Sequence, residues 1–284
     1  MPKRFLVFQS LWAMENIHHG HTAPLEDNLQ QIAAAGFDGI TDHYYQPAHA
    51  RRLAALAGAL DLQIEGQVFP GDIQGLIPAL EAGQAFGCHH ITIQADLRPR
   101  SLREAIRILE GWQRLAEQVA FPVLLETHRY RLNNDLLFTL DLLEQLPDLK
   151  LLADLSHYVV AREFPLPPSP ADQQQIHTIL QHSWGFHGRV SNGQQIQLPL
   201  CYPHHQAWRK VFEDWWRHGM SNWQQRATAD QTLSFTCELG PAPYAITNAA
   251  GLDIVDRWQD SLLLMQTARR LWSESTHALP VGQT

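Results

Sequence analysis

Short apolar segments alternate with longer amphipathic segments eight times along the 284 residues of the chain. The short segments are mostly apolar, as is typical of parallel strands that are buried on both faces. The longer segments have the period of a helix, and one of them begins with Ser101 and Glu104, a capping-box pattern. Strands that alternate with helices in this way indicate βα units and a parallel sheet. Eight such units predict a (β/α)8 TIM barrel of the α/β class with a parallel eight-stranded core.

The expected elements occupy most of the chain. The predicted strands are Phe5–Gln9, Gly39–Thr41, Gln63–Phe69, His90–Gln94, Val123–Glu126, Leu149–Asp154, Gly185–Val190 and Leu233–Glu238. The predicted helices are Leu25–Ala35, Pro47–Leu60, Ile73–Phe86, Ser101–Val119, Asn134–Leu146, Pro170–Gln181, Gln206–His218 and Ile254–Ser275. No linker or low-complexity tract divides them. We therefore expect one TIM-barrel domain over residues 1–284, with a flexible tail from about residue 277 to 284.

Composition and charge exclude several other classes of protein. No GxGxxG or Walker sequence follows a predicted strand, which argues against a nucleotide-binding doubly wound sheet. A net charge of −8 argues against a nucleic-acid partner, and no segment approaches the roughly 18 apolar residues of a membrane span. The cysteines Cys88, Cys201 and Cys237 are odd in number and lack CxxC spacing, so we expect a reducing, cytoplasmic environment.

Four consecutive predicted strands end on side chains that can bind a metal ion. Glu126 ends the fifth, Asp154 the sixth, Glu238 the eighth, and His187 lies near the end of the seventh. Active sites of TIM barrels form where the strands end, so these side chains are expected to converge. Any one of them alone is more often a salt-bridged or hydrogen-bonded residue. Three buried carboxylates together would repel one another, and one divalent cation (Mn²⁺, Mg²⁺, Co²⁺ or Zn²⁺) would compensate them.

The series Glu126, Asp154-x-x-His157, His187-x-Arg189 and Glu238 resembles the xylose isomerase-like TIM-barrel superfamily. That superfamily includes sugar isomerases, ketose 3-epimerases, inosose dehydratases and endonuclease IV. The phrases Glu126-Thr-His-Arg-Tyr-Arg131 and Glu238-Leu-Gly-Pro-Ala-Pro-Tyr244 are similar to those of sugar phosphate isomerase/epimerase-type members. The resemblance implies that Glu126, Asp154, His187 and Glu238 hold the metal ion. It also implies that the two glutamates move the substrate proton, while His157 and Arg189 bind substrate oxygens.

Residues on the first four strands are expected to line the substrate pocket. Of these, we predict that Trp12, His43 and Glu65 contact the substrate, and His128, which follows Glu126 closely, is a further candidate. Trp12 and Tyr44 could stack on a sugar ring or could equally be packed into the wall.

A set of aromatic residues recurs at helical spacing in the predicted helix Gln206–His218. Packing in the outer layer of helices explains them better than a catalytic role, and a contact between subunits of a homo-oligomer is one form that such packing can take. The set comprises Trp208, Phe212, Trp215 and Trp216.

These observations favour a metal-dependent isomerase or epimerase whose partner is a small, carbohydrate-like molecule. It would act on a sugar or polyol-derived carbonyl compound by proton transfer through a metal-stabilised enediolate. A lyase or dehydratase acting on a keto-sugar or inosose is the alternative, because the same ligand set serves both reactions. An endonuclease IV-like nuclease and a catalytically silent sugar-binding barrel are less favoured. No lysine ends a predicted strand, which disfavours aldose isomerisation by hydride shift.

Overall fold

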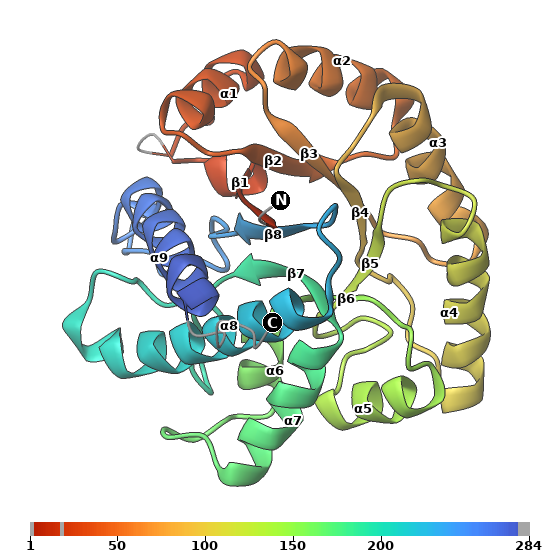
Figure 1. Ribbon diagram of the computed structural model, residues 1–284. Coiled ribbons are helices and arrows are strands. Elements are labelled where there is room, and N and C mark those ends of the chain that lie inside the picture. Colours follow the sequence, from red (N-terminus) through yellow and green to blue (C-terminus); the bar gives the residue numbers. More distant parts are fainter. Residues whose placement is uncertain (1–2, 18–19, 278–284) are drawn as a thin grey trace.

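Eight parallel strands close into a barrel in their sequence order, and helices surround them (Figure 1). The computed structural model describes residues 3–17 and 20–277; the tail predicted to be flexible falls almost entirely outside them. This architecture confirms the predicted TIM barrel. Among the described residues, no helix is long and apolar enough to cross a membrane.

Each strand begins and ends within two residues of its predicted bounds. The strands are β1 (Arg4–Ser10), β2 (Gly39–His43), β3 (Gln63–Val68), β4 (His90–Ile93), β5 (Val123–Glu126), β6 (Leu151–Ala153), β7 (Ser183–Gly188) and β8 (Thr232–Cys237). The ring closes through a parallel ladder between β1 and β8, which runs from the Arg4–Thr232 pair to the Gln9–Cys237 pair. The apolar runs in the sequence therefore located the strands well.

The α-helices lie where the sequence predicted helices, with three main differences. The α-helices are α1 (Leu25–Ala34), α2 (Pro47–Gly58), α3 (Ile77–Phe86), α4 (Leu102–Ala116), α5 (Leu136–Gln145), α6 (Ser156–Ala161), α7 (Pro170–Gln181), α8 (Gln206–Arg226) and α9 (Arg257–His277). Short 3₁₀ helices are η1 (Trp12–Met14), η2 (Gln74–Leu76) and η3 (Pro203–His205). Helix α6 was not predicted, α8 continues well past His218, and the first turn of the third predicted helix is the separate η2.

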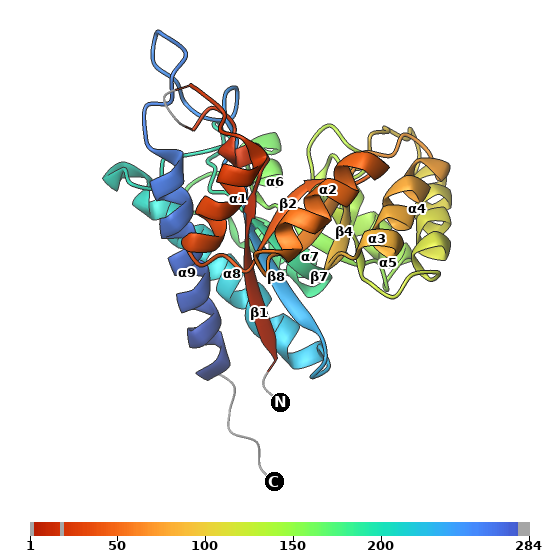
Figure 2. The same ribbon diagram turned by 90° about the horizontal axis from the view of Figure 1, so that it is seen from above.

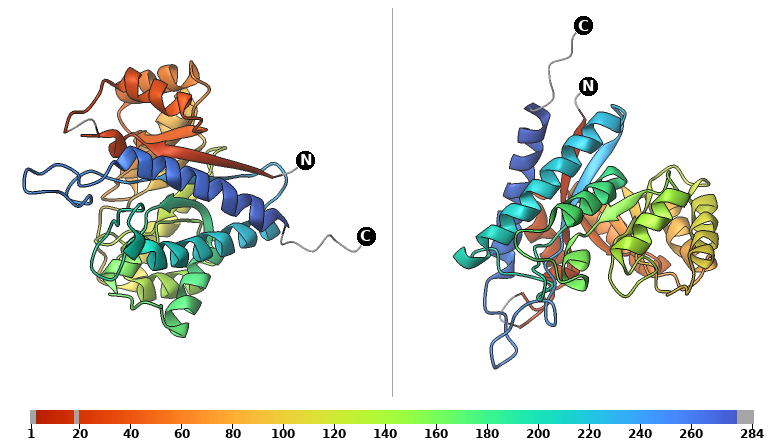
Figure 3. Two further views of the ribbon diagram at one scale, coloured as in Figure 1. Left: turned by 90° about the vertical axis from the view of Figure 1, so that its left-hand side faces the viewer. Right: turned by 90° about the horizontal axis from the view of Figure 1, so that it is seen from below.

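The two longest helices, α8 and α9, lie side by side on the outside of the barrel (Figure 3). The predicted aromatic set of α8 is buried within the chain, because Phe212, Trp215 and Trp216 are at most 1% exposed. Trp216 packs edge-on against Phe235 of β8, with ring centroids 5.1 Å apart. These residues therefore pack the helix on the barrel, in agreement with the expected packing of the outer helices.

Helix α9 covers the strand with which the chain begins. Its Trp272 stacks on Phe5 of β1, with ring centroids 5.0 Å apart and rings nearly parallel. The segment that joins β8 to α9 extends beyond the end of the barrel at which β1 finishes (Figure 2). This is the end at which the carboxyl termini of the parallel strands meet, and it holds the predicted site.

Close packing between the barrel wall and its helices makes a testable prediction at Gly66 in β3. A Cβ atom there would lie 2.6 Å from Ile91 Cδ1 and 2.7 Å from Tyr44 Cβ. We expect Gly66→Ala to lower the free energy of unfolding by about 1–3 kcal/mol, because the packed wall must move to admit a methyl group. Urea denaturation followed by circular dichroism measures the change.

The matched control is Gly58→Ala at the end of α2, where no atom lies within 4 Å of the added methyl group. That change should raise the free energy of unfolding by about 0.5–1 kcal/mol, because alanine loses less conformational entropy in a helix. Equal effects of the two substitutions would contradict the packing described for β3.

Candidate metal centre

The carboxyl ends of β5 to β8 bring together the four side chains that the strand-end pattern singled out. One ligand atom from each of Glu126, Asp154, His187 and Glu238 lies within 4.8 Å of the corresponding atoms of the others. All four residues are buried, and none is more than 4% exposed. Adjacent strands of the closed barrel thus place three carboxylates and one imidazole around one point.

Glu126 is the member of this cluster whose charge is least compensated. Its two carboxylate oxygens are buried, and no described residue donates a hydrogen bond to either of them. The nearest basic atom is Nδ1 of His187, 3.6 Å from Oε1 of Glu126. Burial raises the pKa of Glu126 to about 7. The negative charges of Glu238 and Asp154 also raise this pKa, whereas His187 lowers it. A buried carboxylate in this state is a strong candidate for a ligand that binds a cation.

Arg189 already balances part of the negative charge. Its guanidinium group donates to Oδ2 of Asp154 at 2.5 Å and to Oε2 of Glu238 at 2.6 Å, and its Nε donates to the Glu238 carbonyl at 2.9 Å. Burial alone would raise the pKa of Glu238, but the charges of His187 and Arg189 outweigh it and hold that pKa at about 2. The sequence alone suggested a metal ion as the only counter-charge to the carboxylates. In the structure, Arg189 is a second counter-charge.

His187 presents one ring nitrogen to the cluster and the other to the barrel interior. Nδ1 lies 3.2 Å from Oε2 of Glu238, and Nε2 lies 2.8 Å from Oε1 of Glu65. Burial lowers the pKa of this imidazole, but the surrounding glutamates Glu238, Glu65 and Glu126 raise it well above its ordinary value. The three-oxygen, one-nitrogen donor set, with Glu126 uncompensated, fits a divalent ion of the Mn²⁺, Mg²⁺, Co²⁺ or Zn²⁺ type.

Two neutral histidines lie next to the cluster. The rings of His128 and His157 have centroids 3.7 Å apart, and burial lowers the pKa of both, that of His128 to about 3. Together with Glu126 they form a second group whose atoms could hold a cation. That group has only one carboxylate, and the Arg189 guanidinium lies 3.4 Å from Nε2 of His157, so the four-residue group is better suited to a cation.

Aromatic side chains form one wall beside Arg189. The rings of Trp12 and Tyr244 meet edge to face with centroids 5.0 Å apart, and Cζ of Arg189 lies 4.9 Å from the Tyr244 ring centroid. Gly240 permits this arrangement, because a Cβ atom there would lie 2.0 Å from the Trp12 ring. Trp12 was predicted at the site but Tyr244 was not. In the sequence, Tyr244 could have been found from its position six residues after Glu238, in the same loop.

Three other residues considered from the sequence lie outside the four-residue cluster. His43 is exposed on the rim, where its ring packs edge-on against Phe69 at 5.1 Å. Glu65 lies deeper in the barrel than the ligand cluster, and its oxygens are taken by other side chains of the interior, so we no longer assign it a substrate contact. Tyr44 is packed in the wall, where its hydroxyl donates to the Gly87 carbonyl at 2.9 Å.

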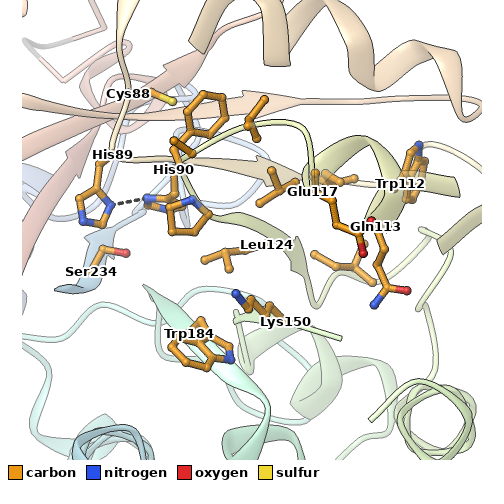
Figure 4. A pocket seen from close by; sticks show the side chains of 18 of the residues that line it. Cys88, His89, His90, Trp112, Gln113, Glu117, Leu124, Lys150, Trp184 and Ser234 are labelled. Atoms are coloured by element: carbon orange, nitrogen blue, oxygen red, sulfur yellow. Dashed lines mark hydrogen bonds between the residues drawn. The ribbon is translucent and has the colours of Figure 1, made fainter. Parts of the chain in front are cut away.

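A large cavity opens at the opposite end of the barrel, near the amino-terminal ends of β4 to β8 (Figure 4). Its volume is about 960 Å³, and His89, His90, Lys150, Trp184 and Ser234 are among the residues that line it. None of the four clustered side chains lines this space. Ligand chemistry rather than cavity size therefore locates the candidate site.

Solved structures with the same arrangement of strands and helices cover nearly the whole chain. A xylose isomerase-like TIM barrel protein from Mycobacterium smegmatis in complex with magnesium has a TM-score of 0.63 at 13% identity, covering 94% of this chain and 97% of its own. The D-psicose 3-epimerase of Clostridium cellulolyticum H10, solved with D-tagatose, has a TM-score of 0.60 at 12% identity, covering 94% and 99%. The chain has the fold of the xylose isomerase-like TIM barrels.

The xylose isomerase-like fold is shared by proteins with different reactions. The "probable 3-DHS dehydratase AsbF" of Bacillus anthracis has a TM-score of 0.54 at 16% identity, covering 93% of this chain and 98% of its own. No family model matches the sequence, and no curated protein matches it either. The resemblance predicted from the strand-end motifs is thus confirmed for the fold, and the reaction has to be argued from the site.

The charge balance at Arg189 generates a prediction for stability. We expect Arg189→Met to lower the free energy of unfolding of the metal-free protein by about 3–5 kcal/mol, because it leaves Asp154 and Glu238 buried without their counter-charge. Added Mn²⁺ should recover part of this loss, since a divalent ion can compensate the same carboxylates. Urea denaturation with and without the ion tests both statements.

Arg217→Met is the matched control, because Arg217 pairs with Asp214 and Glu274 on the exposed side of the helices. Its effect should be about 0–1 kcal/mol and should not depend on Mn²⁺. An Arg189→Met protein as stable as the wild type would refute the charge balance.

Proposed function

We propose that the protein is a divalent-metal-dependent isomerase or epimerase that acts on a sugar or polyol-derived carbonyl compound. The observation that carries this proposal is the Glu126 carboxylate, to which no residue in the described part of the chain donates a hydrogen bond. It faces Nδ1 of His187 beside Asp154 and Glu238. The similarity in fold to a 3-epimerase solved with D-tagatose supports a carbohydrate substrate.

The four clustered residues would hold the ion, and two of them would also transfer protons. When bound, a divalent ion supplies Lewis-acid stabilisation of the negative charge that develops on a carbonyl oxygen. Glu126 ends β5 and Glu238 follows β8, so two carboxyl groups from different parts of the chain lie in one cluster. Such a pair can provide one base and one acid for removal and return of a proton at carbon.

The neighbouring side chains would bind and orient the substrate. Nδ1 of His157 is buried, and no described group forms a hydrogen bond with it, so it can accept a bond from or donate one to a substrate hydroxyl. The Arg189 guanidinium would place positive charge beside a developing oxyanion. Trp12 and Tyr244 would form an apolar wall that a sugar ring can contact and that limits the access of water.

A dehydratase or lyase is the second candidate. A carboxyl group of this cluster, such as that of Glu126, can protonate a departing hydroxyl group as readily as a carbon atom. The similarity in fold to a dehydratase supports the same alternative.

A panel of ketoses and keto-polyols in D₂O, with Mn²⁺ and followed by NMR, distinguishes these reactions. We expect deuterium at the carbon next to the carbonyl group without loss of a hydroxyl group, and no turnover once the ion is removed with a chelator. Loss of a hydroxyl group with formation of a double bond would replace the isomerase proposal by the lyase. Turnover that survives complete removal of metal would contradict both.

Substitution of the two glutamates tests their proton-transfer role. Glu126→Gln and Glu238→Gln should each lower kcat by about 10²–10⁴-fold, because an amide cannot take up the proton. Glu213→Gln is the matched control, since Glu213 is a buried glutamate of α8 that pairs with Arg209 and Arg270 in the outer helix layer. Circular dichroism checks that all three variants fold. An active double variant with Glu126→Gln and Glu238→Gln would contradict the proton-transfer role of these glutamates.

A further inference from the structure

Glu65 crosses the interior of the barrel and makes contact with three other strands. It lies in the middle of β3 and is completely buried. Its Oε1 accepts hydrogen bonds from Oγ1 of Thr92 in β4 at 2.6 Å and from Nε2 of His187 in β7 at 2.8 Å. Its Oε2 accepts one from Oγ1 of Thr236 in β8 at 2.5 Å. Both oxygens are therefore held in place by donors from different sides.

This arrangement constrains the imidazole of His187. A carboxylate that already accepts from two hydroxyl groups can only act as an acceptor toward Nε2, so Nε2 carries a hydrogen. Nδ1 is therefore the nitrogen left to bind an ion, and it points to the side of the ring on which Glu238 and Glu126 lie, 3.2 and 3.6 Å from their nearest oxygens. Glu65 thus fixes the hydrogen on Nε2 and the orientation of the ring from inside the barrel.

We propose that Glu65 is a positioning residue that holds His187 with its proton on Nε2, so that Nδ1 is the atom that binds the metal ion. This role rests on the proposed metal site and adds to it a residue that does not touch the ion. Carboxylates that accept from the second nitrogen of a ligating histidine orient the ring and make it a better ligand.

The residues around Glu65 suit a role in positioning His187 better than a contact with substrate. His90, the other basic group nearby, lies with Nε2 3.6 Å from Oε1 of Glu65 and comes from the wall of the cavity at the far end of the barrel. The threonine hydroxyls would fit any acceptor, but only a carboxylate provides two oxygens that reach β4, β7 and β8 together. A glutamine at this position would still accept from Nε2 through its amide oxygen, although it would lack the charge.

The first experiment observes the tautomer directly. In the protein labelled with ¹⁵N at histidine and loaded with ¹¹³Cd²⁺, we expect His187 to keep its hydrogen on Nε2, with its signals assigned by their loss in His187→Asn. Nδ1 of His187 should show coupling to the metal and Nε2 should not. Coupling at Nε2, or a metal-bound His187 without a hydrogen on Nε2, would overturn the proposal.

The second experiment measures binding of Mn²⁺ by titration calorimetry. The affinity should fall about tenfold in Glu65→Gln, which retains an acceptor, and about 100-fold in Glu65→Ala, which does not. Glu213→Gln, which removes a buried carboxylate far from the site, should bind Mn²⁺ like the wild type. If Glu65→Ala does not fold, the isosteric Glu65→Gln and the tautomer measurement decide the question.

The outcomes separate this inference from the proposed function. A wild-type protein that binds no Mn²⁺ and no Cd²⁺ would refute the metal site itself. A wild-type protein that binds the ion, with unchanged affinity and tautomer in Glu65→Gln and Glu65→Ala, would refute the role of Glu65 alone.

Discussion

The compensation of buried negative charge is the constraint on which the interior of this barrel depends. Four carboxylates lie inside it with almost no exposure to water, namely Glu65, Glu126, Asp154 and Glu238. Asp154 and Glu238 are paired with Arg189, and Glu65 receives three hydrogen bonds. The negative charge that these contacts do not compensate lies on Glu126. Burying an uncompensated charge is strongly unfavourable. The polar network thus indicates one position at which a cation would be stabilised, at the carboxyl ends of β5 to β8.

Much of the fold and the core of the candidate site could be predicted from the sequence, because both depend on local patterns. Apolar runs located every strand, and strand order in a barrel brings the ends of β5 to β8 to one rim. The depth of a residue along the barrel axis could not be predicted, because it depends on how neighbouring strands are staggered. For this reason Glu65 was expected to line the substrate pocket, whereas the register sets it opposite His90, at the start of β4. A spacing of two in an extended segment places Arg189 on the same face as His187, but its double ion pair was missed because the partners, Asp154 and Glu238, come from other parts of the chain.

The side chains around the ligand cluster bear on the reaction more than the cluster itself does. Structures of this fold include a 3-epimerase and the "probable 3-DHS dehydratase AsbF", so the barrel alone does not select between proton return and loss of a hydroxyl group. In this chain the rim combines two neutral histidines, one buried guanidinium and an aromatic wall formed by Trp12 and Tyr244. These groups can bind hydroxyl and carbonyl oxygens and cover one side of a small polar ring. The choice of substrate carbon is expected to depend on them.

Helix α9, which packs over β1 through Trp272 and Phe5, links the two ends of the described chain. The same late segment contributes β8, and Glu238 follows that strand directly. During synthesis on the ribosome, the first seven strands emerge while the barrel still has an open edge between β1 and β7 and while one of its clustered carboxylates is missing. Closure of the ring, coverage of the first strand and assembly of the four side chains consequently all await the last part of the chain. A nascent chain would therefore be unable to capture a metal ion with the full donor set before its fold is complete.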